Sequence, residues 1–276
     1  MSTPATLSAN GAEIPVLGFG TSGLGEDAAE LVAIALRLGY RHLDTARKYG
    51  TERGVGDGIR ASGVPRAEIF LTTKVSHVDL RASDFARSVE TSLGELQVDY
   101  VDLLLIHWPN PRIPVADCMG PLAAAKRAGL ARHIGVANFN TKLLEQAIRA
   151  CPEPLVTNQV ECHAYLDQTR MLAALRRHDM ALTAHCPLAR GRLMGDPVLG
   201  EIAHDRKKTL AQIALRYLVQ QEIVAPIPRS SNPARIAENL DVFDFRLTAD
   251  EMERIAALKR PDGRVANPAA YAPEWD

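Results

Sequence analysis

The chain has 276 residues, 46% of them hydrophobic, which is enough apolar material for one large α/β domain. Its 32 basic and 33 acidic residues balance, and it has no basic tract, so neither nucleic acid nor an anionic membrane is favoured as a partner. No apolar run approaches the roughly 18 residues of a spanning helix, and no secretion signal opens the chain. We therefore expect a soluble, cytoplasmic, single-domain protein over residues 1–276 that acts on small molecules.

The four cysteines are scattered along the chain, at Cys118, Cys151, Cys162 and Cys186. They form neither a C-x-x-C pair nor a zinc-binding spacing, so we expect reduced thiols and no metal site. Cys186 lies two residues beyond the predicted strand 181–184. Since a lone, partly buried cysteine usually behaves as a small hydrophobic residue, we interpret it as a wall or packing residue.

Short apolar runs alternate with amphipathic segments along most of the chain. Ahead of them, Asn10-Gly11 predicts a two-residue turn between 6–8 and 13–15, and so a short hairpin. The predicted strands are 16–20, 41–44, 69–74, 100–106, 133–136, 156–160, 181–184 and 223–227. The predicted helices are 27–38, 51–61, 82–96, 115–128, 141–149, 168–178, 197–204, 209–221, 233–239 and 248–258. About eight strand–helix units predict a (β/α)8 barrel, with the proline-containing tail 260–276 over it.

The first strand ends in a glycine motif that allows another fold. Gly18-Phe19-Gly20-Thr21-Ser22-Gly23 matches G-x-G-x-x-G, with Asp44 about twenty residues further on. An open-sheet Rossmann dehydrogenase would use Asp44 to bind a ribose. The number of strand–helix units argues against this alternative, and so do the polar residues that follow the later strands.

Ionisable side chains stand at or just beyond three successive strand ends. Asp44 and Tyr49 follow one strand, Lys74 ends the next, and His107 follows a third. The C-terminal ends of barrel strands converge on one mouth, where these side chains would meet. A phenol with a pKa near 10 is a weak acid at neutral pH, and a cation about 4 Å away in an effective dielectric of roughly 20 would favour its phenolate by about 4 kcal/mol. We therefore expect Tyr49 to donate a proton, Lys74 to lower its pKa, and Asp44 to keep Lys74 charged.

These residues belong to a longer series of motifs. In chain order the series is Asp44-Thr45-Ala46-x-x-Tyr49-Gly50-x-Glu52, Thr73-Lys74, Asp99-Tyr100-Val101-Asp102-Leu103, His107-Trp108-Pro109, Gly135-Val136-Ala137-Asn138-Phe139, Asn158-Gln159-Val160-Glu161, Cys186-Pro187-Leu188, Ile227-Pro228-Arg229-Ser230 and Glu238-Asn239. It resembles the aldo-keto reductases over nearly the whole chain. The resemblance implies a monomeric barrel that reduces aldehydes or ketones to alcohols, with hydride from a nicotinamide and the proton from Tyr49.

The resemblance also assigns binding residues. Substrate contacts fall to Tyr49, His107 and Trp108, with His107 orienting the carbonyl. The implied cofactor-binding residues are Thr21, Asp44, Asn138, Gln159, His185, Leu188, Arg229, Ser230, Arg235, Glu238 and Asn239. Asn138 and Gln159 would bind the nicotinamide carboxamide.

Several positions depart from the family pattern. Ala137 replaces a common serine, and His185 stands where the family often stacks a tyrosine on the nicotinamide. Arg229 replaces the usual lysine. Because guanidinium groups bind phosphate oxygens in pairs, Arg229 and Arg235 favour the 2′-phosphate of NADP.

The substrate side is expected to be open and polar. Ser22 and Ser76 stand where relatives often have aromatic walls, which favours small or polar carbonyls such as 2,5-diketo-D-gluconate or methylglyoxal. Trp108 and Trp275 are the remaining aromatic candidates, although Trp275 could serve only to anchor the tail. An alternative function is a nicotinamide-binding barrel that acts as a sensor or subunit, but a pure binder has no need for Lys74 behind Tyr49.

Overall fold

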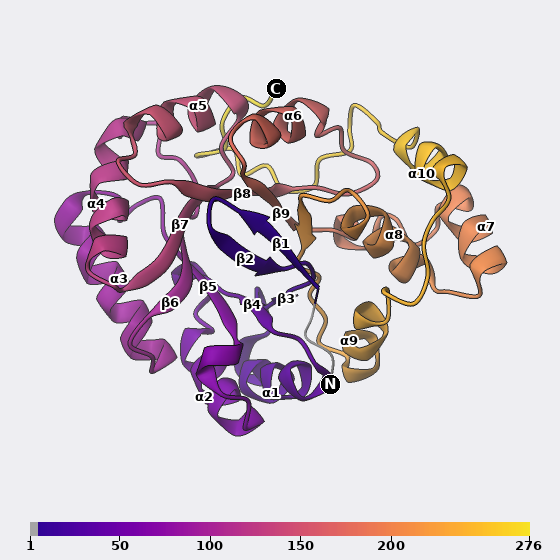
Figure 1. Cartoon of the computed structure of the whole chain (residues 1–276), viewed down its shortest axis with the longest axis horizontal. Helices are drawn as coiled ribbons and strands as arrows, with labels where there is room; N and C mark the ends of the chain where they lie inside the picture. The colour runs from indigo at the N-terminus through magenta and orange to yellow at the C-terminus, as the bar shows by residue number, and fades with distance from the viewer. Residues whose placement is uncertain (1–4) are drawn as a thin grey trace.

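The structure is a computed structural model that describes residues 5–276. Residues 1–4 of the predicted domain lie outside the described residues. Eight parallel strands follow one another around a barrel in chain order from β3 to β10, with helices outside them (Figure 1). The strands are β1 (Thr6–Ala9), β2 (Ala12–Pro15), β3 (Phe19–Gly20), β4 (His42–Asp44), β5 (Phe70–Val75), β6 (Val101–Ile106), β7 (Ala131–Ala137), β8 (Leu155–Glu161), β9 (Ala181–His185) and β10 (Val224–Pro226). The helices are α1 (Ala28–Leu38), α2 (Glu52–Ser62), α3 (Ala82–Leu96), α4 (Val115–Arg127), α5 (Thr141–Ala150), α6 (Thr169–Arg177), α7 (Pro197–Arg206), α8 (Leu210–Val219), α9 (Pro233–Leu240) and α10 (Ala249–Ala256). The predicted (β/α)8 barrel is confirmed.

Backbone hydrogen bonds join the first barrel strand to the last. Gly18 N donates to Pro226 O at 2.9 Å, and Gly20 N donates to Pro228 O at 3.0 Å. These bonds close the barrel between β3 and β10, so the open-sheet alternative is wrong.

The glycines of the G-x-G motif belong to this seam. A Cβ atom on Gly18 would lie 2.7 Å from Ile227 Cγ2, and one on Gly20 would lie 3.0 Å from Ile227 O. The two backbones can approach this closely only because glycine has no side chain. The motif that resembles a dinucleotide-binding turn is therefore explained here by barrel closure.

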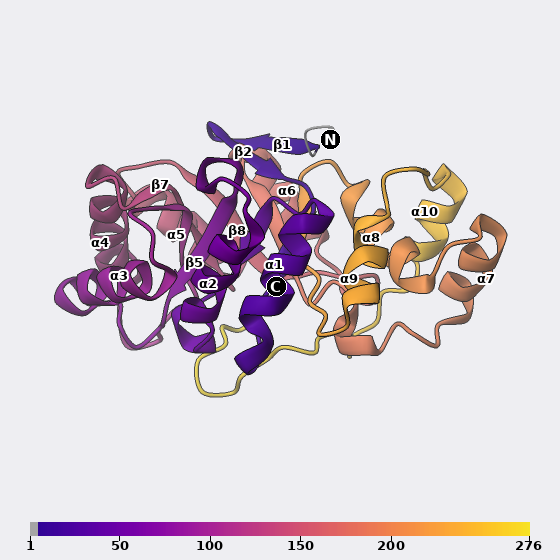
Figure 2. The same cartoon turned by 90° about the horizontal axis from the view of Figure 1, so that it is seen from below.

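A small apolar cluster fills the barrel interior at its N-terminal end. Leu7 and Ile14 of the β1–β2 hairpin pack there with Phe70, Leu103 and Leu105 from the barrel strands. The hairpin has the expected register, from Thr6 opposite Pro15 to Ala9 opposite Ala12. Figure 2 shows it across one end of the barrel, with the C-terminal tail at the other. The C-terminal strand ends therefore face the tail.

The tail is fixed by hydrogen bonds to side chains at this end. The Glu161 carboxylate at the end of β8 accepts from Val265 N at 2.6 Å and Ala266 N at 2.8 Å. Asp276 accepts from Thr141 N at 2.8 Å, at the start of α5. The expectation of a tail packed over the barrel is confirmed.

Most predicted boundaries differ from the observed ones by one or two residues. The first strand differs more: β3 begins at Phe19, because Val16 N donates to Ala5 O and extends the hairpin instead. The predicted helices that start at Thr209 and Thr248 begin one residue later, since both threonines cap their helices through a capping box.

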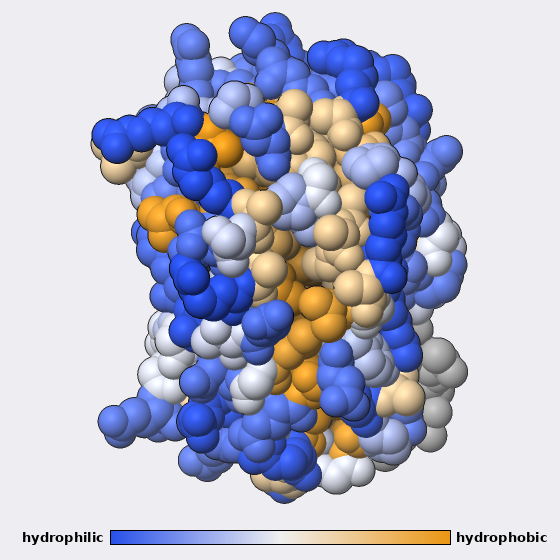
Figure 3. All heavy atoms as spheres, turned by 90° about the vertical axis from the view of Figure 1, so that its left-hand side faces the viewer, coloured by the Kyte–Doolittle hydropathy of each residue, from blue (hydrophilic) through white to orange (hydrophobic). Residues whose placement is uncertain are grey.

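The outer helices bury their apolar faces against the sheet. Figure 3 shows the side that carries α3 and α4, where apolar side chains form a band between hydrophilic ones. In residues 5–276, no helix is long and apolar enough to cross a membrane.

The seam can be tested with a single added methyl group. Gly18→Ala is expected to lower the free energy of unfolding by about 1–3 kcal/mol, because its Cβ would overlap Ile227 and His42. Gly94→Ala in α3 is the matched control: its Cβ would have no neighbour within 4 Å, so it is expected to be neutral or stabilising by about 0.5–1 kcal/mol. Urea denaturation measures both, and equal midpoints for the two variants would contradict the proposed crowding.

Candidate active site

A cavity of about 1440 Å³ lies at the C-terminal ends of the barrel strands. Its lining comes from the segments that follow β3, β4, β6, β7, β9 and β10, from the end of β8 and from the tail. The volume exceeds the roughly 300–1,000 Å³ of a typical small-molecule pocket, so it can hold a large cofactor together with a second molecule.

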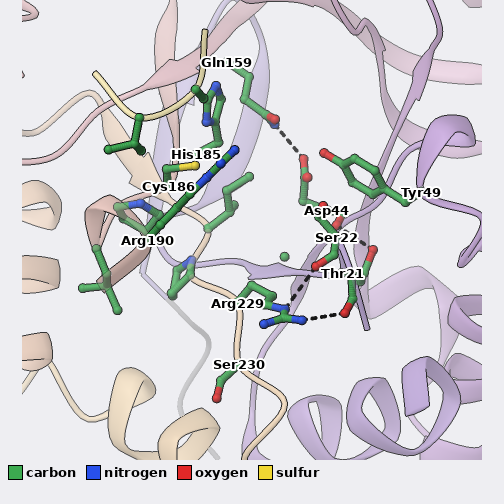
Figure 4. Close-up of a pocket in the computed structure, with 18 of the residues that line it drawn as sticks. Thr21, Ser22, Asp44, Tyr49, Gln159, His185, Cys186, Arg190, Arg229 and Ser230 are labelled. Carbon is green, nitrogen blue, oxygen red and sulfur yellow. Dashed lines mark hydrogen bonds between the residues drawn. The ribbon is translucent and has the colours of Figure 1, made fainter. Parts of the chain in front are cut away.

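A buried ion pair lies beneath the cavity. Lys74, fully buried on β5, donates from Nζ to Asp44 Oδ1 at 2.5 Å and to Thr45 O at 2.8 Å. Gln159 Nε2 donates to the other carboxylate oxygen of Asp44 at 2.6 Å (Figure 4). Asp44 thus links the lysine below the cavity to an amide in its wall.

Tyr49 and His107 meet above this pair. The Tyr49 hydroxyl lies 3.5 Å from His107 Nε2, with the rings edge to face at 82°. Tyr49 ends a 3-10 turn after β4, and His107 follows β6 directly. Lys74 Nζ lies 5.1 Å from the centroid of the Tyr49 ring. The structure therefore brings together the four residues that the sequence singled out.

The expected lowering of the Tyr49 pKa is wrong for this structure. Burial, followed by the charge of Asp44 and that of Cys186, raises the pKa of Tyr49 well above its ordinary value. The reason is that Lys74 directs its hydrogen bonds to Asp44 and Thr45, while the phenol is withdrawn from water. Tyr49 is thus a neutral phenol that holds its proton firmly.

His107 is also held neutral. Burial, assisted by the positive charge of Lys74, places its pKa well below the ordinary value. Its Nδ1 is buried without a hydrogen-bond partner among the described residues, while Nε2 faces Tyr49. A neutral imidazole can donate one hydrogen bond from a single ring nitrogen.

Hydrogen bonds orient the side-chain amide of Asn138 in the cavity wall. Asn138, with φ of 62°, donates from Nδ2 to His107 O at 2.9 Å, and its Oδ1 lies 2.8 Å from His185 Nε2. Burial lowers the pKa of His185 to about 4, so its ring is neutral. A neutral His185 that donates to Asn138 would fix the amide's orientation, a contact that the sequence did not reveal.

The far end of the cavity lies between β3 and α9. Arg229 donates from Nε to Ser22 O at 3.1 Å and from Nη2 to Gly23 O at 2.5 Å (Figure 4). Arg235 lies exposed in the first turn of α9, which Asn232 caps. Arg229 thus ties two loops together here, a contact that the sequence did not predict.

Every residue expected to bind the cofactor lines this one cavity. The set is Thr21, Asp44, Asn138, Gln159, His185, Leu188, Arg229, Ser230, Arg235, Glu238 and Asn239. Of the substrate candidates, Tyr49, His107 and Trp108 line it as well, whereas Lys74 lies behind the wall.

Of the remaining residues expected to form the cavity walls, some line the cavity and others do not. Ser22 and Cys186 line the cavity, and burial raises the pKa of the Cys186 thiol, as suits a wall residue. Ser76 is buried and does not belong to the lining. Trp275 does not line it either: its Nε1 donates to Asn267 Oδ1 at 2.9 Å, so it anchors the tail.

Among the charged and aromatic residues of the lining, sequence reasoning missed Lys48, Arg190 and Tyr271. Lys48 could have been found, because it directly precedes Tyr49 within the strongest motif. Tyr271 gave no signal, since the tail has no periodicity that would show which of its side chains face the cavity.

Comparison with known proteins identifies the family. The sequence model described as "Aldo/keto reductase family" matches residues 16–260. Methylglyoxal reductase DkgB of Escherichia coli O157:H7 is 39% identical over 267 residues, which are 95% of this chain and 99% of that protein. Aldo-keto reductase Rv2971 of Mycobacterium tuberculosis is 40% identical over 261 residues, 94% of this chain and 92% of that protein. The chain belongs to the aldo/keto reductase family and is an oxidoreductase.

Solved structures agree with this assignment. A crystal structure named as a candidate 2,5-diketo-D-gluconic acid reductase B is 47% identical, with a TM-score of 0.96 over 99% of this chain and 98% of that one. Segments 63–66 and 271–276 of the present chain also resemble 2,5-diketo-D-gluconate reductase B of bacteria. An aldo-keto reductase of Bombyx mori in complex with NADP is 32% identical, with a TM-score of 0.87 and 94% coverage of each chain.

The buried pair generates a stability prediction. Asp44→Asn leaves the Lys74 ammonium buried without its counter-ion and is expected to cost about 3–5 kcal/mol of unfolding free energy. Asp57→Asn is the control, because Asp57 pairs with Arg60 at the surface and is expected to cost less than about 1 kcal/mol. Urea denaturation at neutral pH compares them. Similar small losses would show that Lys74 is not charged in the folded protein.

Proposed function

We propose that the protein reduces small or polar aldehydes and ketones to alcohols with NADPH, and that it works as a monomer. The observation that carries the proposal is the approach of Tyr49 Oη and His107 Nε2 to 3.5 Å at the cavity wall, above the buried Asp44–Lys74 pair. Each turnover would convert a carbonyl, NADPH and a proton into an alcohol and NADP⁺.

The cavity suits a nicotinamide dinucleotide. It extends from Tyr49 to Arg235, and the side-chain amides of Asn138 and Gln159 lie in its wall. Within residues 5–276, Gln159 uses only Nε2 in side-chain hydrogen bonds, so its oxygen is free to accept one from a carboxamide. Asn138 and Gln159 would hold the nicotinamide, while Arg229, Ser230, Arg235, Glu238 and Asn239 would hold the adenosine end. When bound, the cofactor supplies the hydride.

Two neutral groups would act on the substrate oxygen. His107 would donate a hydrogen bond from Nε2 and orient the carbonyl, and Tyr49 would donate the proton as charge develops there. Tyr49 is protonated at neutral pH, as a donor must be, but its raised pKa makes it a weak acid, so the proton would be transferred only as negative charge develops on the substrate oxygen. Lys74 Nζ, 5.1 Å from the centroid of the Tyr49 ring, would stabilise the phenolate as it forms, and Asp44 offsets part of this effect.

The substrate class is proposed from the walls and the relatives. Ser22 lines the cavity and is small and polar, so it adds no aromatic bulk to the wall. Relatives of this chain are named for methylglyoxal and for 2,5-diketo-D-gluconic acid. Both are small or polar carbonyl compounds, and we propose the same class here.

Removal of the Tyr49 hydroxyl tests the proposed chemistry. Tyr49→Phe is expected to lower turnover of methylglyoxal by about a hundredfold or more, because it removes the proton donor. NADPH affinity should be nearly unchanged, since the hydroxyl acts on the substrate. Steady-state kinetics and a fluorescence titration measure the two quantities. Near-normal turnover with intact NADPH binding would refute the role of Tyr49.

The preference for NADPH can be tested at Arg235, which is exposed in the first turn of α9. Arg235→Ala is expected to weaken NADPH binding about tenfold and leave NADH binding almost unchanged, because a charge-assisted contact to phosphate contributes roughly 1.5–3 kcal/mol. Arg149→Ala, on α5, controls for net charge. Equal losses for both cofactors would exclude recognition of the 2′-phosphate by Arg235. The Arg229 variant is less direct, since Arg229 also holds the Ser22–Gly23 loop.

A further inference from the structure

Lys48 carries a charge at the mouth of the cavity that the proposed chemistry does not use. It directly precedes Tyr49 in the turn after β4, it is exposed, and it lines the same cavity. Its Nζ donates to the Tyr271 hydroxyl at 2.7 Å and lies 4.9 Å from the centroid of that ring. Within residues 5–276, no carboxylate lies within 4.0 Å of this ammonium.

The surrounding rim is aromatic and close to neutral. Tyr271 stacks on His77 with ring centroids 4.0 Å apart and meets Trp108 edge to face at 5.4 Å. Burial and the charge of Lys48 lower the pKa of His77, although Asp79 opposes this, so His77 is uncharged at neutral pH. His77, Tyr271 and Trp108 therefore add no cation beside Lys48, and the positive charges of the lining that remain are those of its arginines, such as Arg190.

No acid in the lining compensates Lys48. Among the described residues, the acids that line the cavity are Asp44 and Glu238. Asp44 is paired with Lys74. Glu238 belongs to α9, at the far end, and accepts a hydrogen bond from Thr209 at 2.8 Å. The substrate side thus has a net positive charge, which also contributes to the lowered pKa of His107.

An ammonium has three N–H donors, of which Lys48 uses one on Tyr271. Its remaining donors are free for a ligand in the cavity. Since the neighbouring residue is Tyr49, a molecule with its carbonyl oxygen at Tyr49 and His107 could direct another group to Lys48.

We propose that Lys48 binds an anionic group of the substrate, and that the preferred substrates are carbonyl compounds that also carry a carboxylate. This inference rests on the proposed reductase function and narrows its substrate class. A carboxylate matches the single charge of Lys48, whereas a phosphate ester of nearly two charges would leave one uncompensated.

The test compares two aldehydes of nearly the same size and shape, the anionic 4-carboxybenzaldehyde and the neutral 4-formylbenzamide, with NADPH. The wild type is expected to favour the acid in kcat/KM by about tenfold, as one charge-assisted contact allows. Lys48→Met is expected to abolish this preference through a higher KM for the acid, and Lys48→Arg to retain most of it. Lys142→Met, an exposed change on α5 with the same loss of charge, should keep the wild-type ratio.

Two results would overturn the inference: a wild type with no preference for the acid, or an equal loss for both aldehydes in Lys48→Met. The second would mean that Lys48 only positions Tyr271 and the tail. If neither aldehyde is reduced, turnover of methylglyoxal shows whether the proposed function fails as well, and binding of benzoate against benzamide then decides the role of Lys48 separately. Quenching of tryptophan fluorescence measures that binding, since Trp108 lines the cavity. Benzoate should lose about tenfold in affinity in Lys48→Met, while equal wild-type affinities for the two ligands would contradict the inference.

Discussion

The buried pair of Asp44 and Lys74 is the constraint on which the site depends. Two charges without access to water are stable only when each is fully engaged, and here Lys74 bonds to a carboxylate and a carbonyl while Asp44 also accepts from Gln159. These contacts join β4, β5 and β8 across the barrel interior. The contacts that keep this pair in place therefore also hold Tyr49 and Gln159 at fixed positions in the cavity wall.

Much of the architecture could be predicted because local patterns and global fold agree. The alternation of apolar runs and amphipathic helices identified the barrel, and the strand-end positions of Asp44, Lys74 and His107 predicted where they meet. The resemblance supplied the far end of the cavity, whose residues carry no chemistry that spacing alone reveals. The first strand was harder, since its glycines fit two folds until hydrogen bonds to Pro226 and Pro228 distinguished them.

What escaped prediction depends on contacts between distant segments. Lys74 was expected to act directly on the Tyr49 phenol. A sequence, however, cannot show to which of several nearby acceptors an ammonium group donates its hydrogen bonds. Tyr271 lies at the cavity because distant residues hold the tail, among them Glu161, which accepts from two backbone amides more than a hundred residues away in the chain. Orientation of Asn138 by His185 depends likewise on side-chain rotamers.

The seam between β3 and β10 also has a dynamic consequence. The loops bridged by Arg229 continue directly from the strands that Gly18 and Gly20 join, so separation of these strands would also disturb that end of the cavity. Amide hydrogen exchange at Gly18 and Gly20 therefore reports local opening of the barrel wall. A molecule that contacts both loops would slow this exchange. Its binding would therefore be detected at Gly18 and Gly20, although neither residue has a side chain that could contact it.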